Sequence, residues 1–386
     1  MPQQQRRWDV FGKVVDNFGD AGVGWRLARE LAAEHALEVT LWQDDLATLA
    51  HMAPGIDPQL DRQFAAGVTV RRWREPFPDV VPADVAIETF GCGLPSSYVA
   101  AMARAAPPPV WFVLEYLSAE PWVGDVHGLA SPHPELGLPR RFWFPGFTAK
   151  TGGLIREAGL LAARDEFRRN EAAQRTLWST LGVSAPSKDE VRVTLFCYPN
   201  AVLPALLDAW ANGDDTIVCI VPEGVATRAL AAWGAGSVPH PGRPLRRGRL
   251  SLHSVPFVSQ DDYDRLLWSS SLNFVRGEDS FVRAQWAASP FMWHIYPQAD
   301  GAHWAKLGAF MDRYTAGLDA DASAGVRRFW RAWNGADGAG PIDAAWLEFV
   351  SAREAVGRHS RAWAAHLASL PELGAGLVDA GRSWYD

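Results

Sequence analysis

The sequence predicts an α/β protein of two Rossmann-like domains that face a cleft, followed by a helical tail. Strand-like runs alternate with helical patterns throughout the first half of the chain. A second alternating series begins after the polar stretch 184–190, and beyond residue 302 nearly all apolar residues recur at helical spacing. Such alternation is typical of parallel sheets that are covered by helices on both faces.

The first half contains five apolar runs of strand length, at 8–15, 37–42, 68–73, 84–90 and 110–117. Apolar residues between these runs recur every three or four positions, which predicts helices at 24–35, 46–53 and 96–105. A longer amphipathic pattern predicts helix over 153–181.

The second half repeats this organisation. Strands are expected at 191–198, 216–222, 250–258, 272–275 and 291–296. Helices are expected at 201–211, 225–233, 262–270 and 279–288. We therefore predict a first domain over 1–184 and a second over 185–360, with a final helix of about 361–386 packing back on the first domain.

Composition restricts the class of protein. The 386 residues are 48% hydrophobic and 21% charged, as in an ordinary globular chain, and the net charge of −7 argues against general nucleic-acid binding. The three cysteines, Cys92, Cys197 and Cys219, lack metal-ligand spacing and are expected to be reduced thiols. No apolar run reaches the length of a membrane span, and the polar start lacks a signal-peptide core. We expect a soluble cytoplasmic protein without a membrane or nucleic-acid partner.

The most informative stretch is 14–26, where a strand leads into a loop that holds Asp16, Asp20 and three glycines, ahead of a helix. Ligands of α/β folds gather where the carboxyl end of a strand meets the next helix. Because carboxylates repel phosphate, the two acids point to a basic or hydroxyl-bearing ligand. The alternative, and the commoner case, is a tight turn in which Asp20 caps the helix.

A second polar block, 274–286, follows a buried strand of the second half. Arg276 offers a planar cationic fork suited to phosphate, and the helix that opens at Asp279 and Ser280 attracts anions. The acids of this block suit sugar hydroxyls. The alternative is a capping motif, with Asp279 or Ser280 as the N-cap and Arg276 paired with Glu278.

Aromatic residues mark the same edge of the second predicted sheet. Phe196, Tyr198, Phe257 and Tyr296 all lie at the carboxyl ends of predicted strands, and Gln260 follows Phe257 closely. Any one of these rings alone would be read as core packing. Four of them around a phosphate-binding turn favour a nucleotide site.

Several other patterns carry no site. The pair Asp319 and Asp321 lies between helical segments and reads as a solvated loop. The glycines of 19–24 do not form the dinucleotide fingerprint, and no Walker loop or nucleophile elbow occurs. The histidines show no zinc-ligand spacing, so the sequence predicts no metal.

Taken together, these blocks resemble the bacterial protein-arginine rhamnosyltransferases that modify elongation factor P. The resemblance runs nearly end to end, and the two acidic blocks together make it specific. It is carried by residues 14–20, 25–29, 41–46, 196–200, 276–281 and 291–296.

The resemblance implies a GT-B glycosyltransferase fold and transfer of L-rhamnose from dTDP-β-L-rhamnose to an arginine of elongation factor P. It implies inversion, with neither a metal nor another cofactor. By matched position, Asp20 is the expected catalytic carboxylate, and Asp16 and Glu278 are also essential. The expected diphosphate neighbourhood is Arg276, Asp279, Ser280 and Tyr296. The expected thymidine pocket is Phe196, Tyr198, Phe257 and Gln260.

Two other functions compete with this interpretation. One is a GT-B enzyme with another acceptor, such as a lipid or a sugar, and the lack of basic amphipathic segments counts against the lipid. The other is a catalytically silent nucleotide-sugar-binding protein. The presence of Asp16, Asp20 and Glu278 together counts against this second alternative.

Overall fold

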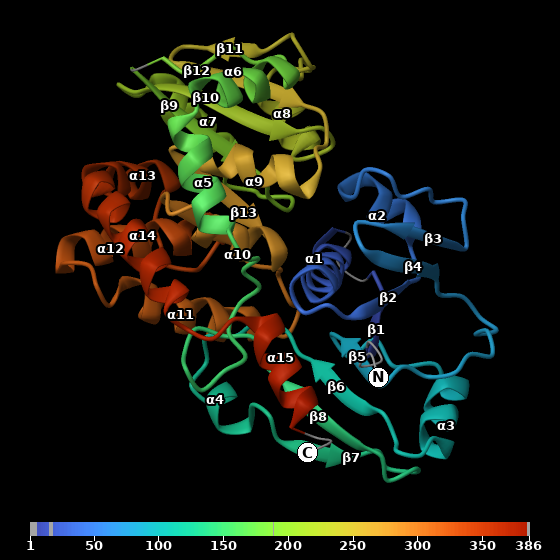
Figure 1. The fold of residues 1–386 in the computed structure, drawn as a ribbon. Helices are drawn as coiled ribbons and strands as arrows, with labels where there is room; N and C mark the ends of the chain where they lie inside the picture. The colour runs from blue at the N-terminus through green and yellow to red at the C-terminus, as the bar shows by residue number, and fades with distance from the viewer. Residues whose placement is uncertain (1–5, 15–17, 188, 384–386) are drawn as a thin grey trace. The chain divides into compact units, whose positions relative to one another are not determined.

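The computed structural model of the protein describes residues 6–14, 18–187 and 189–383. The chain divides into two compact units, Met1–Ala158 with Ala368–Asp386, and Gly159–Leu367. Each unit has its own sheet with helices around it (Figure 1). This confirms the predicted α/β class.

The first unit is built on an eight-stranded sheet in the order β3-β4-β2-β1-β5-β6-β8-β7. Its strands are β1 (Arg7–Gly12), β2 (Glu38–Gln43), β3 (Arg62–Ala65), β4 (Val68–Arg72), β5 (Val85–Thr89), β6 (Val110–Leu114), β7 (Ala130–Pro132) and β8 (Pro139–Trp143). Its helices are α1 (Phe18–Glu34), α2 (Leu46–Met52), α3 (Ser96–Arg104), α4 (Val123–Val126) and α15 (Leu373–Arg382). Only the edge strands β3 and β7 pair antiparallel; the inner strands are parallel.

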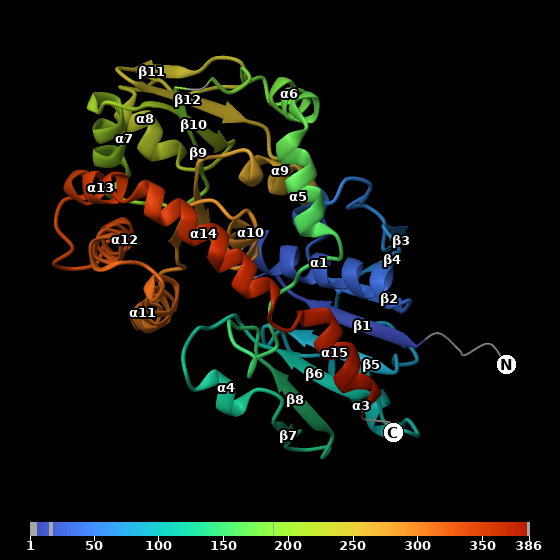
Figure 2. The same cartoon turned by 60° about the vertical axis from the view of Figure 1, so that its left-hand side comes forward.

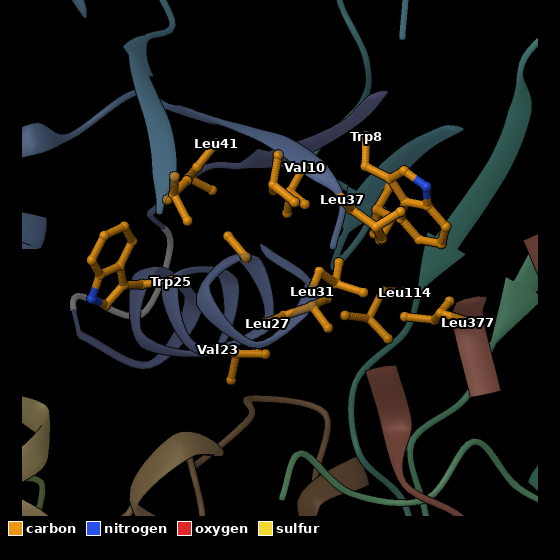
Figure 3. Close-up of a cluster of buried hydrophobic side chains, with 14 of the residues drawn as sticks. Trp8, Val10, Val23, Trp25, Leu27, Leu31, Leu37, Leu41, Leu114 and Leu377 are labelled. Carbon is orange, nitrogen blue, oxygen red and sulfur yellow. The ribbon is translucent and has the colours of Figure 1, made fainter. Parts of the chain in front are cut away.

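The core of the first unit follows from the two-residue period of its strands. In β1, Trp8 and Val10 face a cluster that includes α1, α2 and α15, whereas Phe11 faces a second cluster that includes α3. Figure 3 shows Leu377 of α15 in the same cluster as Leu31 of α1. The helix at the C-terminal end therefore packs in the core of the first unit, along its sheet (Figure 2).

The second unit has a six-stranded sheet in the order β11-β12-β10-β9-β13-β14, parallel except for β11. Its strands are β9 (Glu190–Leu195), β10 (Thr216–Pro222), β11 (Leu245–Arg247), β12 (Leu250–Val255), β13 (Leu272–Arg276) and β14 (Phe291–His294). Its helices are α5 (Leu160–Arg169), α6 (Glu171–Thr180), α7 (Leu203–Asn212), α8 (Thr227–Trp233), α9 (Gln260–Trp268), α10 (Asp279–Trp286), α11 (Ala302–Thr315), α12 (Ala320–Trp333), α13 (Ile342–Ser351) and α14 (Arg353–Ala368).

The segment expected as one helix over 153–181 forms two helices, α5 and α6. Asn170 ends α5 and caps α6, with its side chain accepting from the Ala173 amide at 3.0 Å. Arg168 of α5 donates from Nε to the Trp268 carbonyl at 2.9 Å. These helices therefore lie with the second unit, and the chain divides at 158/159 and 367/368, whereas the sequence suggested 184/185 and 360/361.

The helical tail expected beyond residue 302 forms α11 to α15. Its aromatic rings pack on one another: the Tyr314 ring centre lies 5.6 Å from that of Trp363 and 5.9 Å from that of Trp330. None of the helices in the described part of the chain combines the length and apolarity needed to cross a bilayer.

Candidate functional site

In both units the order of strands reverses direction at one point. The first unit adds β2 and β4 on one side of β1 and later places β5 and β6 on the other. The second unit adds β10 and β12 on one side of β9 and then β13 and β14 on the other. Ligands of open α/β sheets bind at the carboxyl ends of strands at such a reversal. The polar blocks of the sequence follow β1 and β13, so each lies at one of these points.

Asp20 lies in the first turn of α1, and only 4% of its surface is exposed. The prediction of a loop up to a helix start at residue 24 was wrong at this end, because α1 begins at Phe18. Burial of the early turns against the sheet outweighs the weak helix propensity of the glycines. Asp20 therefore follows the helix start instead of preceding it as an N-cap, and the amino-terminal end of a helix favours a negative charge. Asp16 lies outside the described residues.

Asp44, at the end of β2, fixes the chain between β1 and α1. Its Oδ1 accepts from the amide of Val14 at 3.0 Å, from Nε2 of Gln43 at 2.9 Å and from the amide of Asp45 at 2.8 Å. One carboxylate thus joins the ends of two neighbouring strands just ahead of the acidic segment. Asp44 belongs to the family pattern at 41–46, and its role becomes visible only in the structure.

The first unit also carries a stacked aromatic pair that the sequence analysis missed. The rings of Phe90 and Tyr116 lie 4.5 Å apart with planes 15° from parallel, and Tyr116 is 37% exposed. Phe90 and Gly91 follow β5, the neighbour of β1, with positive φ angles of 55° and 63°. The glycines at 91 and 93, directly after a buried strand, were the signal available for this turn. Because Tyr116 is exposed, its ring at this edge can contact a planar cation.

In the second unit, Arg276 brings residues from two strand ends together. Its Cζ lies 4.5 Å from the ring centre of Phe196 and 4.7 Å from that of Tyr198, and its Nη1 donates to the Cys197 carbonyl at 3.3 Å. Phe196 to Tyr198 follow β9, and Arg276 ends the adjacent β13. The predicted cation and two of the predicted aromatic residues therefore form one cluster.

The turn between β13 and α10 is held by an aromatic residue of β14. Gly277 has a φ of +63°, which favours glycine, and its carbonyl accepts from Nε1 of Trp293 at 2.9 Å. The Trp293 ring stacks on Phe281 of α10 at 4.0 Å. Glu278 comes next at the N-cap position, and its side chain makes no cap hydrogen bond. Trp293 thus fixes the backbone that presents Glu278.

Ser280 closes the same turn. Its Oγ donates to the Arg276 carbonyl and accepts from the Arg276 amide. The N-cap position belongs to Glu278, so neither Asp279 nor Ser280 is the cap that the alternative interpretation requires.

The other predicted donor-site residues lie at the same sheet edge. Gln260, the first residue of α9, donates from Nε2 to Oδ2 of Asp279 at 3.3 Å, which joins the start of α9 to the start of α10. Tyr296 is 53% exposed, and its ring meets that of Tyr198 edge-on at 5.3 Å. Phe257 is half-buried and follows β12, two strands away from β9.

Two buried titratable groups near Arg276, His294 and Cys197, are uncharged at pH 7. Burial lowers the pKa of His294 to about 4, and the Arg276 cation adds to this shift, so His294 is neutral at pH 7. The His294 ring lies 5.4 Å from that of Tyr198. Burial raises the pKa of the Cys197 thiol to about 12, so Cys197 is not an activated nucleophile. Arg276 is therefore the cation of this cluster, beside the amino-terminal end of α10.

The second unit thus presents an arginine fork, a helix start and aromatic rings, which suit a nucleoside diphosphate. The first unit presents a buried carboxylate at a helix start, which suits a cation or a hydroxyl group.

Comparison with known proteins adds independent findings. Residues 8–380 match the family described as Elongation-Factor P (EF-P) rhamnosyltransferase EarP. A protein-arginine rhamnosyltransferase of Pseudomonas putida is 48% identical over 371 residues, covering 96% of this chain and 97% of the relative. A solved structure concerning EarP-mediated arginine glycosylation of translation elongation factor EF-P is 36% identical, with a TM-score of 0.70 and coverage of 98% and 99%.

A more distant structure supports the fold alone. The spinosyn rhamnosyltransferase SpnG is 13% identical, with a TM-score of 0.52 over 98% of this chain and all of that one. With the nearer match, this confirms the predicted GT-B glycosyltransferase fold.

Proposed function

This chain belongs to the elongation factor P rhamnosyltransferase family EarP, and we propose that it moves L-rhamnose from dTDP-β-L-rhamnose to an arginine of elongation factor P. The enzyme is a glycosyltransferase, and the proposal adds its donor, its acceptor and inversion at the anomeric carbon. The observation that carries the donor assignment is the Arg276 cluster, which joins a cation, two aromatic rings and a helix start at one strand reversal.

We assign the dTDP group to the second unit. The guanidinium of Arg276 and the amino-terminal end of α10 can bind the two phosphates. The edge formed by Phe196, Tyr198, Phe257 and Gln260 is the proposed site of thymidine. Tyr296 is exposed beside Tyr198 and is the proposed outer contact of the diphosphate.

Departure of dTDP requires stabilisation of the negative charge that develops on its diphosphate. Arg276 and the dipole of α10 supply positive potential there, so the proposed reaction uses no metal and no further cofactor. Glu278, presented by the turn that Trp293 fixes, is proposed to orient the hydroxyls of rhamnose.

The acceptor poses a harder problem, because a free guanidinium has a pKa far above neutral and stays protonated. A carboxylate cannot remove that proton beforehand. Asp20 is proposed to bind the guanidinium, to aim one nitrogen at the anomeric carbon and to take the proton as the bond forms. The C–N bond forms while the bond from carbon to the diphosphate oxygen breaks, and attack opposite the leaving group inverts the centre. Asp16 is proposed to bind the other edge of the guanidinium.

Mass spectrometry of purified elongation factor P tests this proposal. After incubation with the enzyme and dTDP-β-L-rhamnose, we expect one added deoxyhexose on one arginine, and none with UDP-glucose as the donor. EDTA should leave the initial rate at room temperature unchanged. Consumption of the donor without modified elongation factor P would favour another acceptor. No transfer and no donor hydrolysis would favour the catalytically silent protein. Because the acceptor is a translation factor, we place the reaction in the cytoplasm.

A further inference from the structure

Three side chains of the first unit converge at the far end of α1 from Asp20. Glu30 lies in the last part of α1, His35 directly follows that helix, and Glu372 is the N-cap residue of α15. One potential ligand atom from each lies within 4.8 Å of the other two. Glu30 is ten residues beyond Asp20, or about 15 Å along a helix axis, so this cluster is separate from the proposed catalytic carboxylate.

Two of the three side chains, Glu30 and His35, have buried polar atoms without a hydrogen-bond partner. Glu30 is 1% exposed, and both of its carboxylate oxygens are buried without a hydrogen-bond partner, as is Nε2 of His35. A buried carboxylate without a donor is strongly unfavourable unless a proton or a cation accompanies it. Gly374 allows the close approach, because a Cβ at that position would lie 2.4 Å from Oε1 of Glu30.

The surroundings of Glu30 are negative. Burial, and then Glu372, Glu157 and Glu34, raise the pKa of Glu30 to about 11. The nearby cation Arg26 is paired with Glu157 at 3.4 Å. Three carboxyl groups therefore surround the buried carboxyl group of Glu30, which also lies near the imidazole of His35.

Two of the neighbouring carboxylates, Glu34 and Glu372, accept hydrogen bonds from the backbone. Glu34 accepts from the Ala158 amide at 2.6 Å. Glu372 accepts from the amides of Gly374 at 2.8 Å and Ala375 at 2.7 Å, which fixes its carboxylate at the start of α15. Glu372 is therefore held in place beside Glu30, whose buried carboxyl group requires a proton or a cation.

We propose that Glu30, His35 and Glu372 bind one divalent transition-metal ion, with Zn²⁺ as the best fit. Imidazole nitrogen and carboxylate oxygen are both ordinary zinc ligands, at about 2.0–2.2 Å from the ion. Small side-chain rotations would bring the three atoms within coordination distance. The ion would join α1 to α15, two helices that are far apart in the sequence, and so fix the C-terminal helix in the core of the first unit. This role is structural and takes no part in rhamnose transfer.

Because zinc binds deprotonated carboxylates and neutral imidazole, metal binding at this cluster competes with protons. We therefore expect proton release on binding and an affinity that rises with pH. Calorimetry in two buffers of different ionisation enthalpy measures that release directly.

The test uses the full-length protein, first made metal-free with a chelator that is then removed. Titration with ZnSO₄ should give one ion per chain, and saturating zinc should raise Tm by about 3 °C or more. Co²⁺ should give the visible absorption of a site with nitrogen and oxygen ligands. His35→Gln, at a half-buried position, should weaken zinc binding by about tenfold or more, and Glu30→Gln should abolish it.

His240→Gln is the matched control, because His240 is exposed and lies in the second unit. This variant should bind zinc as the parent does. Absence of binding to the parent, or equal binding by His35→Gln, would overturn the proposal. Two results together would show that the carboxyl groups of Glu30 and Glu372 share a proton and bind no metal. The Tm of the parent would not change with zinc, and the metal-free Glu30→Gln variant would have a higher Tm than the parent. Rhamnose transfer at room temperature should persist without metal, which separates this inference from the proposed reaction.

Discussion

The starts of α1 and α10 occupy corresponding places in the two units but carry opposite chemistry. Each helix begins at the carboxyl edge of its sheet, at the point where strand order reverses. The α1 start presents Asp20 in a helix that includes glycines, whereas the α10 start follows Arg276 and contains no glycine. The shared fold therefore supplies the place, and a few side chains decide whether that place suits a cation or an anion.

The two units also differ in the titratable groups that are buried in their sheets. Burial raises the pKa of Asp9 in β1 to about 6, although hydrogen bonds such as that from Tyr98 oppose the shift. Burial lowers the pKa of His294 in β14 to about 4. Both shifts have the same first cause, and both favour the neutral form. Their effects on stability have opposite signs over nearly the same range of pH.

The largest effect is expected from a substitution that removes the proposed catalytic carboxylate of α1 and leaves the residues around α10 unchanged. Asp20→Asn preserves the shape of the side chain but removes its charge and its capacity to take a proton. We expect the maximal rate of transfer to fall by about 10²–10⁴-fold. The affinity for dTDP should remain unchanged, because the proposed nucleotide site lies in the other unit. A rhamnosylation time course beside calorimetric titration with dTDP measures both quantities.

Asp337→Asn is the control, since it removes an exposed carboxylate of the second unit. It should change neither quantity. An Asp20→Asn variant that keeps its maximal rate but loses dTDP affinity would assign that acid to donor binding or to structure.

The next largest effect concerns the pH dependence of stability. Because folded Asp9 keeps its proton up to about pH 6, whereas an unfolded aspartate loses it near pH 4, the folded state binds more protons between these values. The contribution of Asp9 to stability is present at low pH and is lost as the pH rises through 6, by up to about 3 kcal/mol. Asp9→Asn should therefore gain stability relative to the parent from pH 4 to pH 6.

His294→Gln should show the opposite trend. In the unfolded chain His294 is protonated below about pH 6.5, whereas in the folded protein it stays neutral down to about pH 4. The unfolded state therefore binds more protons in this range, so the contribution of His294 makes the parent more stable as the pH rises. Urea unfolding of all three proteins at pH 4, 5, 6 and 7 measures both trends. Equal pH profiles for Asp9→Asn and the parent would contradict the inferred burial effect on Asp9.

A smaller effect is expected when the cation at α10 is kept but its shape is changed. Arg276→Lys retains the charge but loses the planar fork and the contact of that plane with Phe196 and Tyr198. We expect the Kd for dTDP to rise roughly tenfold or more, about 1.4 kcal/mol per factor of ten. Calorimetric titration checks this, with Arg265→Lys as the control at a surface ion pair. Unchanged dTDP affinity would place the diphosphate away from Arg276.

The comparison also shows what could be predicted from the sequence. The inner strands of both sheets have strong apolar runs bounded by polar turns, so β1, β2, β9 and β13 lie close to where the patterns predict them. The Arg276 cluster was predictable because carboxyl ends of adjacent parallel strands meet at one edge.

Elements that depend on tertiary contacts were not predictable in this way. The edge strand β3 joins β4 through Ala66 and Gly67, both with positive φ, and alanine there hides the usual hairpin signal. The strand β11 joins β12 through Gly248 and Arg249, where a glycine signal was present and was overlooked. The start of α1 was missed because its glycines resemble a loop until their burial is known.

The smallest expected effect tests whether glycine in α1 serves stability or function. Gly24 lies inside the helix with an ordinary φ, and a Cβ there would meet Leu41 Cδ1 at 3.8 Å, which is normal contact. Gly24→Ala should raise the free energy of unfolding by about 0.5–1 kcal/mol, since alanine loses less backbone entropy on forming a helix. Gly374→Ala is the contrasting variant, because its Cβ would approach Oε1 of Glu30 to 2.4 Å and should destabilise the protein. Urea unfolding measures both, and rhamnosylation rates are taken alongside. A Gly24→Ala variant that is more stable but transfers rhamnose more slowly would show that catalysis needs a mobile or closely approached backbone in α1. A variant that is less stable than the parent would contradict the inference that a Cβ fits beside Leu41.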